Sequence, residues 1–314
     1  MSLTTILRDP QRFVWLYGTT PTRADVPEAK MHFAAERLGN RARKLQIDGV
    51  VVYDIQDETG RTNAERPFPF LPTRESREYA RLVRELSGRE TICYKCVRNE
   101  TPQSWRDWLD SAAEEPGFSC LSLVGQPTSR RPETGMSLGD AMAEAKGHAG
   151  LFTLGGVAIP ERHSPERSES QRLLEKAERG CEYFVSQAIY SPRVTARLLR
   201  DYAADCARTG LAPKRIVLTF TPCGNERTLA FMKWLGIAVS EEAERRLETA
   251  ENKLEESLNI CAENLTRVLE EAGDTGVPLG VNVESVSIRK DEIAASVELV
   301  QRLKEVTRGF GIAE

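Results

Sequence analysis

Polar and ionisable side chains follow several strand-like runs of this chain, at the point where each run ends. Carboxylate and amide groups gathered in one place suit a polar heterocyclic or sugar-like ligand, and a carboxyl whose pKa is raised by burial can act as a general acid. The residues of this kind are Tyr17, Asp54, Asp57, Glu58, Gln126, Glu161, His163, Gln187, Asn225, Glu226, Asn282 and Glu284. We expect them to converge in one polar cup.

The cup requires parallel strands that end on one rim. The segment 151–226 holds three strand-like runs, each followed by a polar turn, and helical patterns lie between them. Five more runs extend this pattern over the whole chain, at 13–17, 49–53, 91–97, 120–124 and 279–284. Alternating strands and helices with no low-complexity linker are typical of a (β/α)8 TIM barrel. We therefore predict an α/β fold with a single barrel domain spanning 1–314.

A long charged helical tract at 240–273 is an addition to this pattern. Its apolar residues share one stripe, and any break is expected near Ser257. The tract is a candidate surface for a homo-oligomer, with a solvated barrel helix as the alternative.

The charge balance argues against several classes of partner. Forty-three basic and forty-seven acidic residues give a net charge of −4, with both signs interspersed. A nucleic-acid-binding protein would need a clustered basic face. We find neither an apolar run of about 20 residues nor a signal peptide, so we expect no membrane partner and a cytoplasmic location.

The cysteines give no sign of a metal site. Seven are scattered along the chain, an odd number, and we expect reduced thiols. Cys93 and Cys96 form a C-x-x-C inside a strand-like run with no second pair. Burial is the favoured interpretation over metal or redox chemistry. Dinucleotide-fold, P-loop, serine-hydrolase and zinc-protease motifs are also missing from the sequence.

Each site residue also has a purely structural interpretation. A carboxylate that follows a strand can cap the next helix or pair with an arginine. His163 stands where the chain turns towards a helix, so a pocket role and a capping role are equally open. Lys176 lies well inside that helix and is either solvated or in contact with a ligand. The residues alone therefore predict a barrel enzyme with a polar cup and no particular reaction.

Three motifs resemble the methylenetetrahydrofolate reductase family. The segment 157–163 is similar to the family's V-A-x-Y-P-E-x-H, 180–187 to its A-G-A-x-x-x-x-T-Q, and 221–225 to its P-V-S-N, in the same order and with similar spacing. A weaker likeness covers 123–127, where the family has L-R-G-D-P. The resemblance implies a barrel that reduces 5,10-methylenetetrahydrofolate to 5-methyltetrahydrofolate with NADH or NADPH, commonly through bound FAD.

The resemblance also implies roles for individual residues. Gln187 falls on the glutamine that binds the pterin of tetrahydrofolate, and Asn225 and Gln126 fall on neighbouring substrate positions. The positions implied for cofactor binding are Gly125, Ile159, Glu161, His163 and Lys176.

Departures from the family pattern leave FAD use open. Tyr17 stands where the family has its proposed catalytic glutamate, Val124 replaces an arginine, Gln126 replaces the aspartate beside the flavin ring, and Glu226 replaces an aromatic residue. A divergent NAD(P)H-dependent reductase would need another acid. Its candidate catalytic residues are Glu226, Glu58, Glu284 and Tyr17.

Two alternatives to reduction stay open. In one, the barrel keeps a folate site and serves as a folate-binding or one-carbon (methyl) transfer protein. In the other, it is a regulatory or structural barrel.

Overall fold

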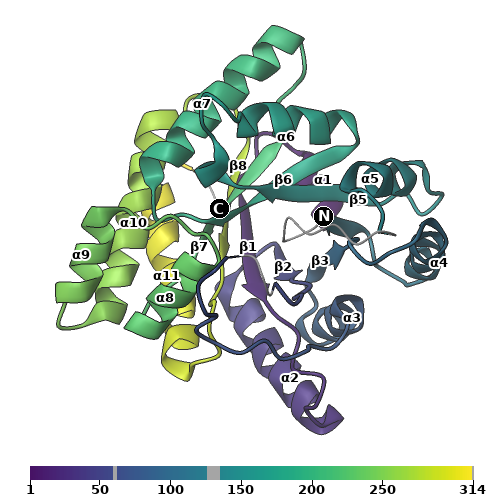
Figure 1. Ribbon diagram of the computed structural model, residues 1–314, viewed down its shortest axis with the longest axis horizontal. Coiled ribbons are helices and arrows are strands. Elements are labelled where there is room, and N and C mark those ends of the chain that lie inside the picture. The colour runs from purple at the N-terminus through teal and green to yellow at the C-terminus, as the bar shows by residue number, and fades with distance from the viewer. Residues whose placement is uncertain (59–61, 126–134, 313–314) are drawn as a thin grey trace.

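The chain folds into a closed barrel of eight parallel strands surrounded by helices (Figure 1). The computed structural model describes residues 1–58, 62–125 and 135–312. The strands are β1 (Val14–Thr19), β2 (Gly49–Val52), β3 (Glu90–Cys96), β4 (Cys120–Val124), β5 (Thr153–Ala158), β6 (Cys181–Ala188), β7 (Arg215–Phe220) and β8 (Leu279–Val283). Each pairs with the next, and β8 pairs with β1. The predicted (β/α)8 barrel is confirmed.

The helices follow the strands and cover the outside of the barrel, except α1, which precedes β1 (Figure 1). They are α1 (Leu3–Arg8), α2 (Glu28–Leu45), α3 (Ser76–Ser87), α4 (Pro102–Ala113), α5 (Leu138–Gly147), the 3-10 turn η1 (Pro160–Arg162), α6 (Glu169–Glu178), α7 (Pro192–Thr209), α8 (Glu226–Trp234), α9 (Glu241–Thr249), α10 (Lys253–Ala272) and α11 (Lys290–Gly309). In the described part of the chain, none is both long and apolar enough to cross a membrane.

Two separate apolar clusters result from the alternation of side chains along each strand. The larger one lies between the strands and the outer helices and includes Trp15 and Tyr17 of β1. The smaller one fills the barrel interior and includes Val14 and Leu16 of the same strand. On β1, odd-numbered residues from 15 therefore face the helices and even-numbered residues face the interior.

Helix α1 closes the end of the barrel where the strands begin. Its Leu3, Ile6 and Leu7 belong to the interior cluster. Arg215, at the start of β7, is 1% exposed and donates to the carbonyl oxygens of Leu7 at 3.1 Å and Leu279 at 2.5 Å. A guanidinium holds α1 in place because its several donors satisfy backbone carbonyls. Sequence analysis missed this helix.

The charged tract differs from its predicted form. It consists of α9 and α10, and the break lies at 250–252 and not near Ser257. Asn252 caps α10 by accepting from the backbone N–H of Glu255 at 3.2 Å, which explains why the new helix begins there. Ser257 is instead a buried residue within α10.

Candidate functional site

The opposite end of the barrel, where the strands end, carries polar side chains that face inward. We call this end the mouth. Asn282 lies on β8 and Glu284 directly follows it, while Tyr53 follows β2 and Thr219 lies on β7. Tyr53 packs with the interior cluster, as expected two residues after the interior Val51. A phenol, an amide, a hydroxyl and a carboxyl therefore meet at the mouth.

Asn282 is the centre of this group. Its side chain is fully buried, and its Nδ2 donates to the Tyr53 hydroxyl at 2.9 Å and to Thr219 Oγ1 at 3.3 Å. The same nitrogen lies 3.4 Å from Oε2 of Glu284. Its Oδ1 is buried without a hydrogen-bond partner among the described residues.

Glu284 holds its proton more tightly than an ordinary glutamate. Burial raises the pKa of Glu284, and the nearby polar groups of Tyr53 and Asn282 only partly offset that effect. Burial also raises the pKa of Tyr53 well above its usual value, so Tyr53 remains a neutral hydroxyl. A partly buried carboxyl of this kind can donate a proton to a ligand.

Gly18 makes room for the group. This glycine lies on β1, between β8 and β2 in the barrel. A Cβ atom there would stand 2.9 Å from the Cβ of Glu284 and 2.9 Å from a ring carbon of Tyr53. Any side chain at position 18 would therefore push Tyr53 and Glu284 apart.

A second polar group lies where β5 and β6 end. Gln187 donates through Nε2 to the carbonyl oxygen of Leu235 at 2.7 Å. Glu161, in η1, accepts from the backbone N–H of Ala238, and burial raises the pKa of Glu161 to about 7. Its Oε2 is buried without a partner among the described residues. Leu235 and Ala238 both belong to the connection between α8 and α9. Gln187 and Glu161, two residues that the sequence predicts for the site, therefore contact the same connection.

The acidic turn after β2 has its own structural partners. Asp54 accepts from the backbone N–H of Cys96 and from the amide of Gln56, both at 2.7 Å, while burial raises its pKa. Asp57 and Glu58 both act electrostatically on Arg66. Glu58 is partly buried and keeps its place among the candidate acids.

The expected place of Tyr17 at the mouth is wrong. Its hydroxyl hydrogen-bonds with Ser296 of α11 at 2.7 Å, in the layer between the barrel and the helices. Tyr17 is an outward residue of β1, whereas Gly18 is the inward one at this level.

Asn225 and Glu226 also differ from expectation, because both belong to the start of α8. Asn225 caps this helix by accepting from the backbone N–H of Thr228 at 3.0 Å, and its Nδ2 donates to the fully buried Glu292 at 3.0 Å. The Glu226 side chain is 85% exposed and lies 4.0 Å from Lys253. Helix capping and the bond to Glu292 thus account for the contacts of Asn225. Glu226 lies outside the polar group at the mouth.

His163 and Lys176 have partners outside the polar group of Tyr53, Asn282 and Glu284. His163 hydrogen-bonds through Nε2 to Asp201 of α7 at 2.7 Å. Lys176 reaches from α6 to the carbonyl oxygen of Val157 at 2.6 Å, and burial lowers its pKa. Both side chains therefore lie between the barrel and its outer helices.

The remaining cofactor and substrate positions follow β4 and β5. Ile159 donates its backbone N–H to the buried Glu169 at 3.1 Å. Gly125 is partly buried, and its carbonyl oxygen accepts from the thiol of Cys96 at 3.5 Å. Gln126 lies outside the described residues.

The segment 62–75, which leads into α3, passes beside α8 (Figure 1). The guanidinium of Arg66 lies 5.4 Å from the ring centre of Phe231 and 4.9 Å from that of Trp234. Trp234 donates its indole N–H to Ala64 at 3.1 Å, and Arg227 donates to the carbonyl oxygen of Pro67 at 2.7 Å. Cation–π contacts and hydrogen bonds thus fasten the segment to α8.

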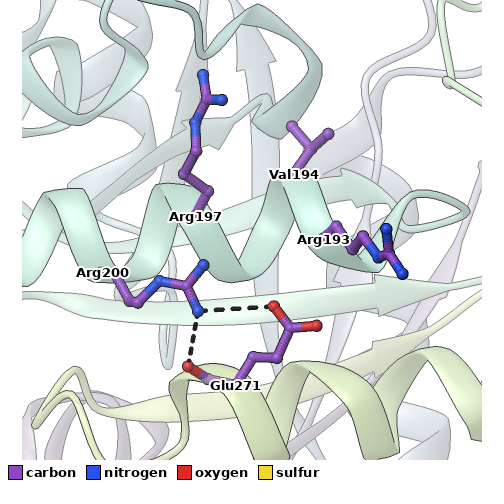
Figure 2. A pocket seen from close by; sticks show the side chains of 5 residues that line it. All are labelled: Arg193, Val194, Arg197, Arg200 and Glu271. Atoms are coloured by element: carbon purple, nitrogen blue, oxygen red, sulfur yellow. Dashed lines mark hydrogen bonds and ion pairs between the residues drawn. The ribbon is translucent and has the colours of Figure 1, made fainter.

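A basic groove on the outside of the barrel is separate from the mouth. A cavity of about 430 Å³ is lined by Arg193, Arg197 and Arg200 of α7 and by Glu271 of α10. Figure 2 shows how these side chains lie. Arg200 pairs with Glu271, with 3.6 Å between their charged atoms. No residue that the sequence predicts for the site lines this groove.

The cysteines are free thiols, and all seven are buried. Cys93 and Cys96 contact different partners, Ser76 and Gly125. Among the described residues, no three side chains of His, Cys, Asp or Glu are grouped as a metal site would need.

Comparison with known proteins found similarity to solved structures only. No protein-family model matches the sequence, and no curated protein matches it. Two structures of dihydropteroate synthase from Xanthomonas albilineans, with 4-aminobenzoic acid and with indole-2-carboxylic acid plus 6-chloroguanine, share 13% and 12% identity. Each covers 95% of this chain and 94% of its own, with a TM-score of 0.44.

A much stronger similarity is to an uncharacterized protein from Clostridium thermocellum that binds two copies of 5-methyl-5,6,7,8-tetrahydrofolic acid. The alignment covers 97% of this chain and 99% of that one, with 30% identity and a TM-score of 0.82. The chain described here therefore belongs to the same protein family as this Clostridium thermocellum protein.

Proposed function

We propose that this chain binds a reduced folate at the mouth and acts on its one-carbon unit. The Clostridium relative binds 5-methyltetrahydrofolic acid, which supports a tetrahydrofolate as ligand. Within the chain, the observation that carries the proposal is the partly buried polar group of Tyr53, Asn282 and Glu284 at the mouth. Amide and carboxyl groups complement a pterin ring because its edge alternates hydrogen-bond donors and acceptors.

Gln187 is the proposed pterin-binding residue. It lies at the end of β6 and uses its amide nitrogen to contact Leu235. Its amide oxygen makes no hydrogen bond with the described residues, so it can accept from a pterin N–H. Glu161 lies beside the same connection and supplies a second acceptor.

For the reaction, we propose reduction of 5,10-methylenetetrahydrofolate by NAD(P)H. Ring opening requires a proton on the amine nitrogen that leaves the methylene carbon, and hydride from the nicotinamide then converts the iminium carbon to a methyl group. Glu284 is the proposed acid because its pKa is raised by burial. Glu58 is the second candidate, and the exposed side chain of Glu226 makes it the weakest.

We propose that this reduction proceeds without FAD. His163 and Lys176, which the family resemblance implies as flavin contacts, bond instead to Asp201 and to the Val157 carbonyl. A direct hydride transfer from NADH or NADPH needs neither side chain at the mouth.

Methyl transfer is the second candidate reaction. It is favoured by the ligand of the Clostridium relative, which already carries the 5-methyl group. Transfer of that methyl to an acceptor nucleophile leaves the electron pair on the pterin nitrogen, and the same acid would protonate it. Glu284 would serve both reactions in the same way.

The test begins with binding of 5-methyltetrahydrofolate by isothermal titration calorimetry. Anaerobic oxidation of NADH and of NADPH is then measured with 5,10-methylenetetrahydrofolate, with and without FAD. Binding plus oxidation without FAD would support the reductase, binding without oxidation would support methyl transfer, and absence of binding would contradict the proposal.

Two matched variants test which carboxyl group is the general acid. Glu284→Gln and Glu58→Gln keep the size of the side chain and remove its exchangeable acid proton. We expect Glu284→Gln to lower turnover at least about a hundredfold, as loss of a general acid does, with little change in folate affinity. Glu298→Gln, an exposed carboxylate on α11, serves as the control.

A further inference from the structure

The basic groove on the outside of the barrel carries an excess of positive charge. Its cavity of about 430 Å³ has the size of a small-molecule pocket. Three arginines and one glutamate line it, which leaves two positive charges there, in a protein whose net charge is −4. A local excess of this sign attracts anions.

The three arginines share one face of α7. Arg193, Arg197 and Arg200 are four and three residues apart, a spacing that places side chains one above another on a helix. At a rise of about 1.5 Å per residue, their Cα atoms span about 10 Å along the helix axis. The groove therefore presents a row of guanidinium groups that can contact two acid groups of one ligand.

Arg200 is held in place from the neighbouring helix. Its Nη1 donates to the backbone carbonyl oxygen of Glu271 at 3.0 Å and lies 3.6 Å from the Glu271 carboxylate (Figure 2). Glu271 belongs to the last turn of α10, where carbonyl oxygens lack partners within the helix. Both contacts use Nη1, so Nε and Nη2 of Arg200 can donate to a ligand.

Arg193 and Arg197 have fewer partners than Arg200. Arg197 donates through Nη2 to the carbonyl oxygen of His163 at 3.5 Å, and it acts electrostatically on the exposed Glu166. Arg193 makes no hydrogen bond or ion pair with any residue that the structure describes. Most donors of these two guanidinium groups are therefore open to a ligand.

The positive charges in this row repel one another. Like charges four residues apart destabilise a helix, whereas opposite charges at that distance stabilise it. On α3, for example, Arg81 pairs with Glu85. On α7, the residues three and four positions after Arg193 are Ala196 and Arg197. A bound anion would therefore relieve a repulsion that the helix itself does not balance.

The lining also limits the kind of anion. Its remaining residue is Val194, and no aromatic side chain of the described chain lines the cavity. A purine or pterin ring would thus find no ring to stack on. Guanidinium groups bind carboxylate and phosphate oxygens through paired hydrogen bonds. The groove therefore suits an acidic ligand without an aromatic ring.

We propose that the basic groove is a second binding site, separate from the mouth, for a non-aromatic ligand that carries at least two carboxylate or phosphate groups. Arg193 and Arg197 bind one acid group, Arg200 binds another, and Val194 contacts the apolar part between them. No motif in the sequence indicates this site.

The site is tested by isothermal titration calorimetry at constant ionic strength. The probes are pyrophosphate and propane-1,2,3-tricarboxylate, with acetate as the monovalent reference. We expect at least one multivalent probe to bind at least about tenfold more tightly than acetate, because two acid groups are contacted together. The tighter of the two identifies phosphate or carboxylate as the natural chemistry. Equal affinity for all three anions would overturn the proposal.

Matched variants locate the binding. Arg193→Gln and Arg197→Gln should each weaken binding of the tighter probe about tenfold through loss of a charged contact. Arg208→Gln removes the same charge from a 66% exposed position on the same helix, outside the groove, and should leave the affinity unchanged. Equal weakening in Arg193→Gln and Arg208→Gln would show attraction by general charge and would overturn the site.

Glu271→Gln should act in the opposite direction. It removes the one acid that lines the groove and leaves the backbone carbonyl oxygen that anchors Arg200. The affinity for the tighter probe should therefore rise about threefold or more. An affinity that stays the same or falls in this variant would contradict binding of an anion beside Glu271.

A folate titration checks that the groove and the mouth are separate. These probes contain no folate, so their result does not depend on the proposed function. If the wild type binds 5-methyltetrahydrofolate, Arg193→Gln should bind it within about twofold, as expected for independent sites. Tenfold weaker folate binding in this variant would contradict a second, separate site.

Discussion

The amide of Asn282 on β8 donates to the hydroxyl of Tyr53 beyond β2 across 2.9 Å, although β1 lies between these two strands. Contact over an intervening strand is feasible only where that strand carries no side chain at the same level. Gly18 is the residue of β1 at this position, and both Tyr53 and Glu284 lie against it. The polar group at the mouth therefore depends on a glycine near the end of β1.

Gly18→Ala should separate Tyr53 from Glu284. The new methyl group would stand 2.9 Å from atoms of both side chains, so at least one must move. We expect a loss of stability of about 1–3 kcal/mol from overpacking and at least a tenfold loss of turnover, since the proposed acid is displaced. Thermal unfolding and anaerobic turnover measure the two effects.

Gly147→Ala is the control for that substitution. Gly147 lies in α5, and a Cβ there meets no atom within 4 Å, so stability should stay the same or rise slightly. Wild-type turnover in Gly18→Ala would show that the mouth tolerates the methyl group and that close contact across β1 is unimportant.

Tyr17 and Tyr53 show that the sequence could predict the strands but not which face of a strand points into the barrel. The strand-like runs 13–17 and 49–53 both end in tyrosine, and both strands were correctly identified. Which face of a strand points inward depends on how the barrel closes. β1 turns Tyr17 to α11 and β2 turns Tyr53 to the mouth. Short-range patterns carry no information about that choice.

Helix α1 and the contacts between the segment 62–75 and α8 escaped prediction for a related reason. Three apolar residues in a six-residue helix are too few for a periodic signal, although Ser2 does cap α1. Arg66 finds its aromatic partners on α8, far away in the sequence. Long-range contacts of this kind become visible only in the folded chain.

Glu161→Gln should change stability in a pH-dependent way. Burial raises the pKa of Glu161 to about 7 from its ordinary 4.5, so the folded protein binds this proton more tightly than the unfolded chain. The resulting stabilisation is complete below about pH 4.5 and is lost as the pH rises through about 7. Relative to wild type, the variant should therefore gain up to about 3 kcal/mol between pH 5 and pH 8.

Chemical denaturation at these two pH values measures the gain. Glu226→Gln removes a negative charge from an exposed position and controls for the change in net charge. If both variants changed alike, or if Glu161→Gln showed no dependence on pH, burial would not be what controls the Glu161 carboxyl.

Arg215→Met should loosen the closed end of the barrel. The substitution leaves the buried carbonyl oxygens of Leu7 and Leu279 without their donor, and we expect a loss of roughly 2–4 kcal/mol. Arg8→Met removes an ion pair with Glu182 whose arginine side chain is 52% exposed, which should cost less than about 1 kcal/mol. Equal effects in denaturant titrations would argue against a special role for Arg215 in anchoring α1.

Arg66→Leu should release the segment 62–75 from α8. The variant loses the cation–π contacts with Phe231 and Trp234, worth about 1–2 kcal/mol. Hydrogen exchange should then quicken in 62–75 while the strands stay protected. Arg23→Leu changes an exposed ion pair with Asp25 and is the control. Unchanged exchange in 62–75 would show that other contacts hold the segment.

Calorimetric titration of 5-methyltetrahydrofolate into three proteins tests the central claim most directly. We predict that wild type binds, that Gln187→Ala binds at least about tenfold more weakly through loss of a pterin contact, and that His163→Ala, altered away from the mouth, binds within about threefold of wild type. Absence of binding to wild type, or equal affinity in Gln187→Ala, would contradict a folate site at the mouth of the barrel.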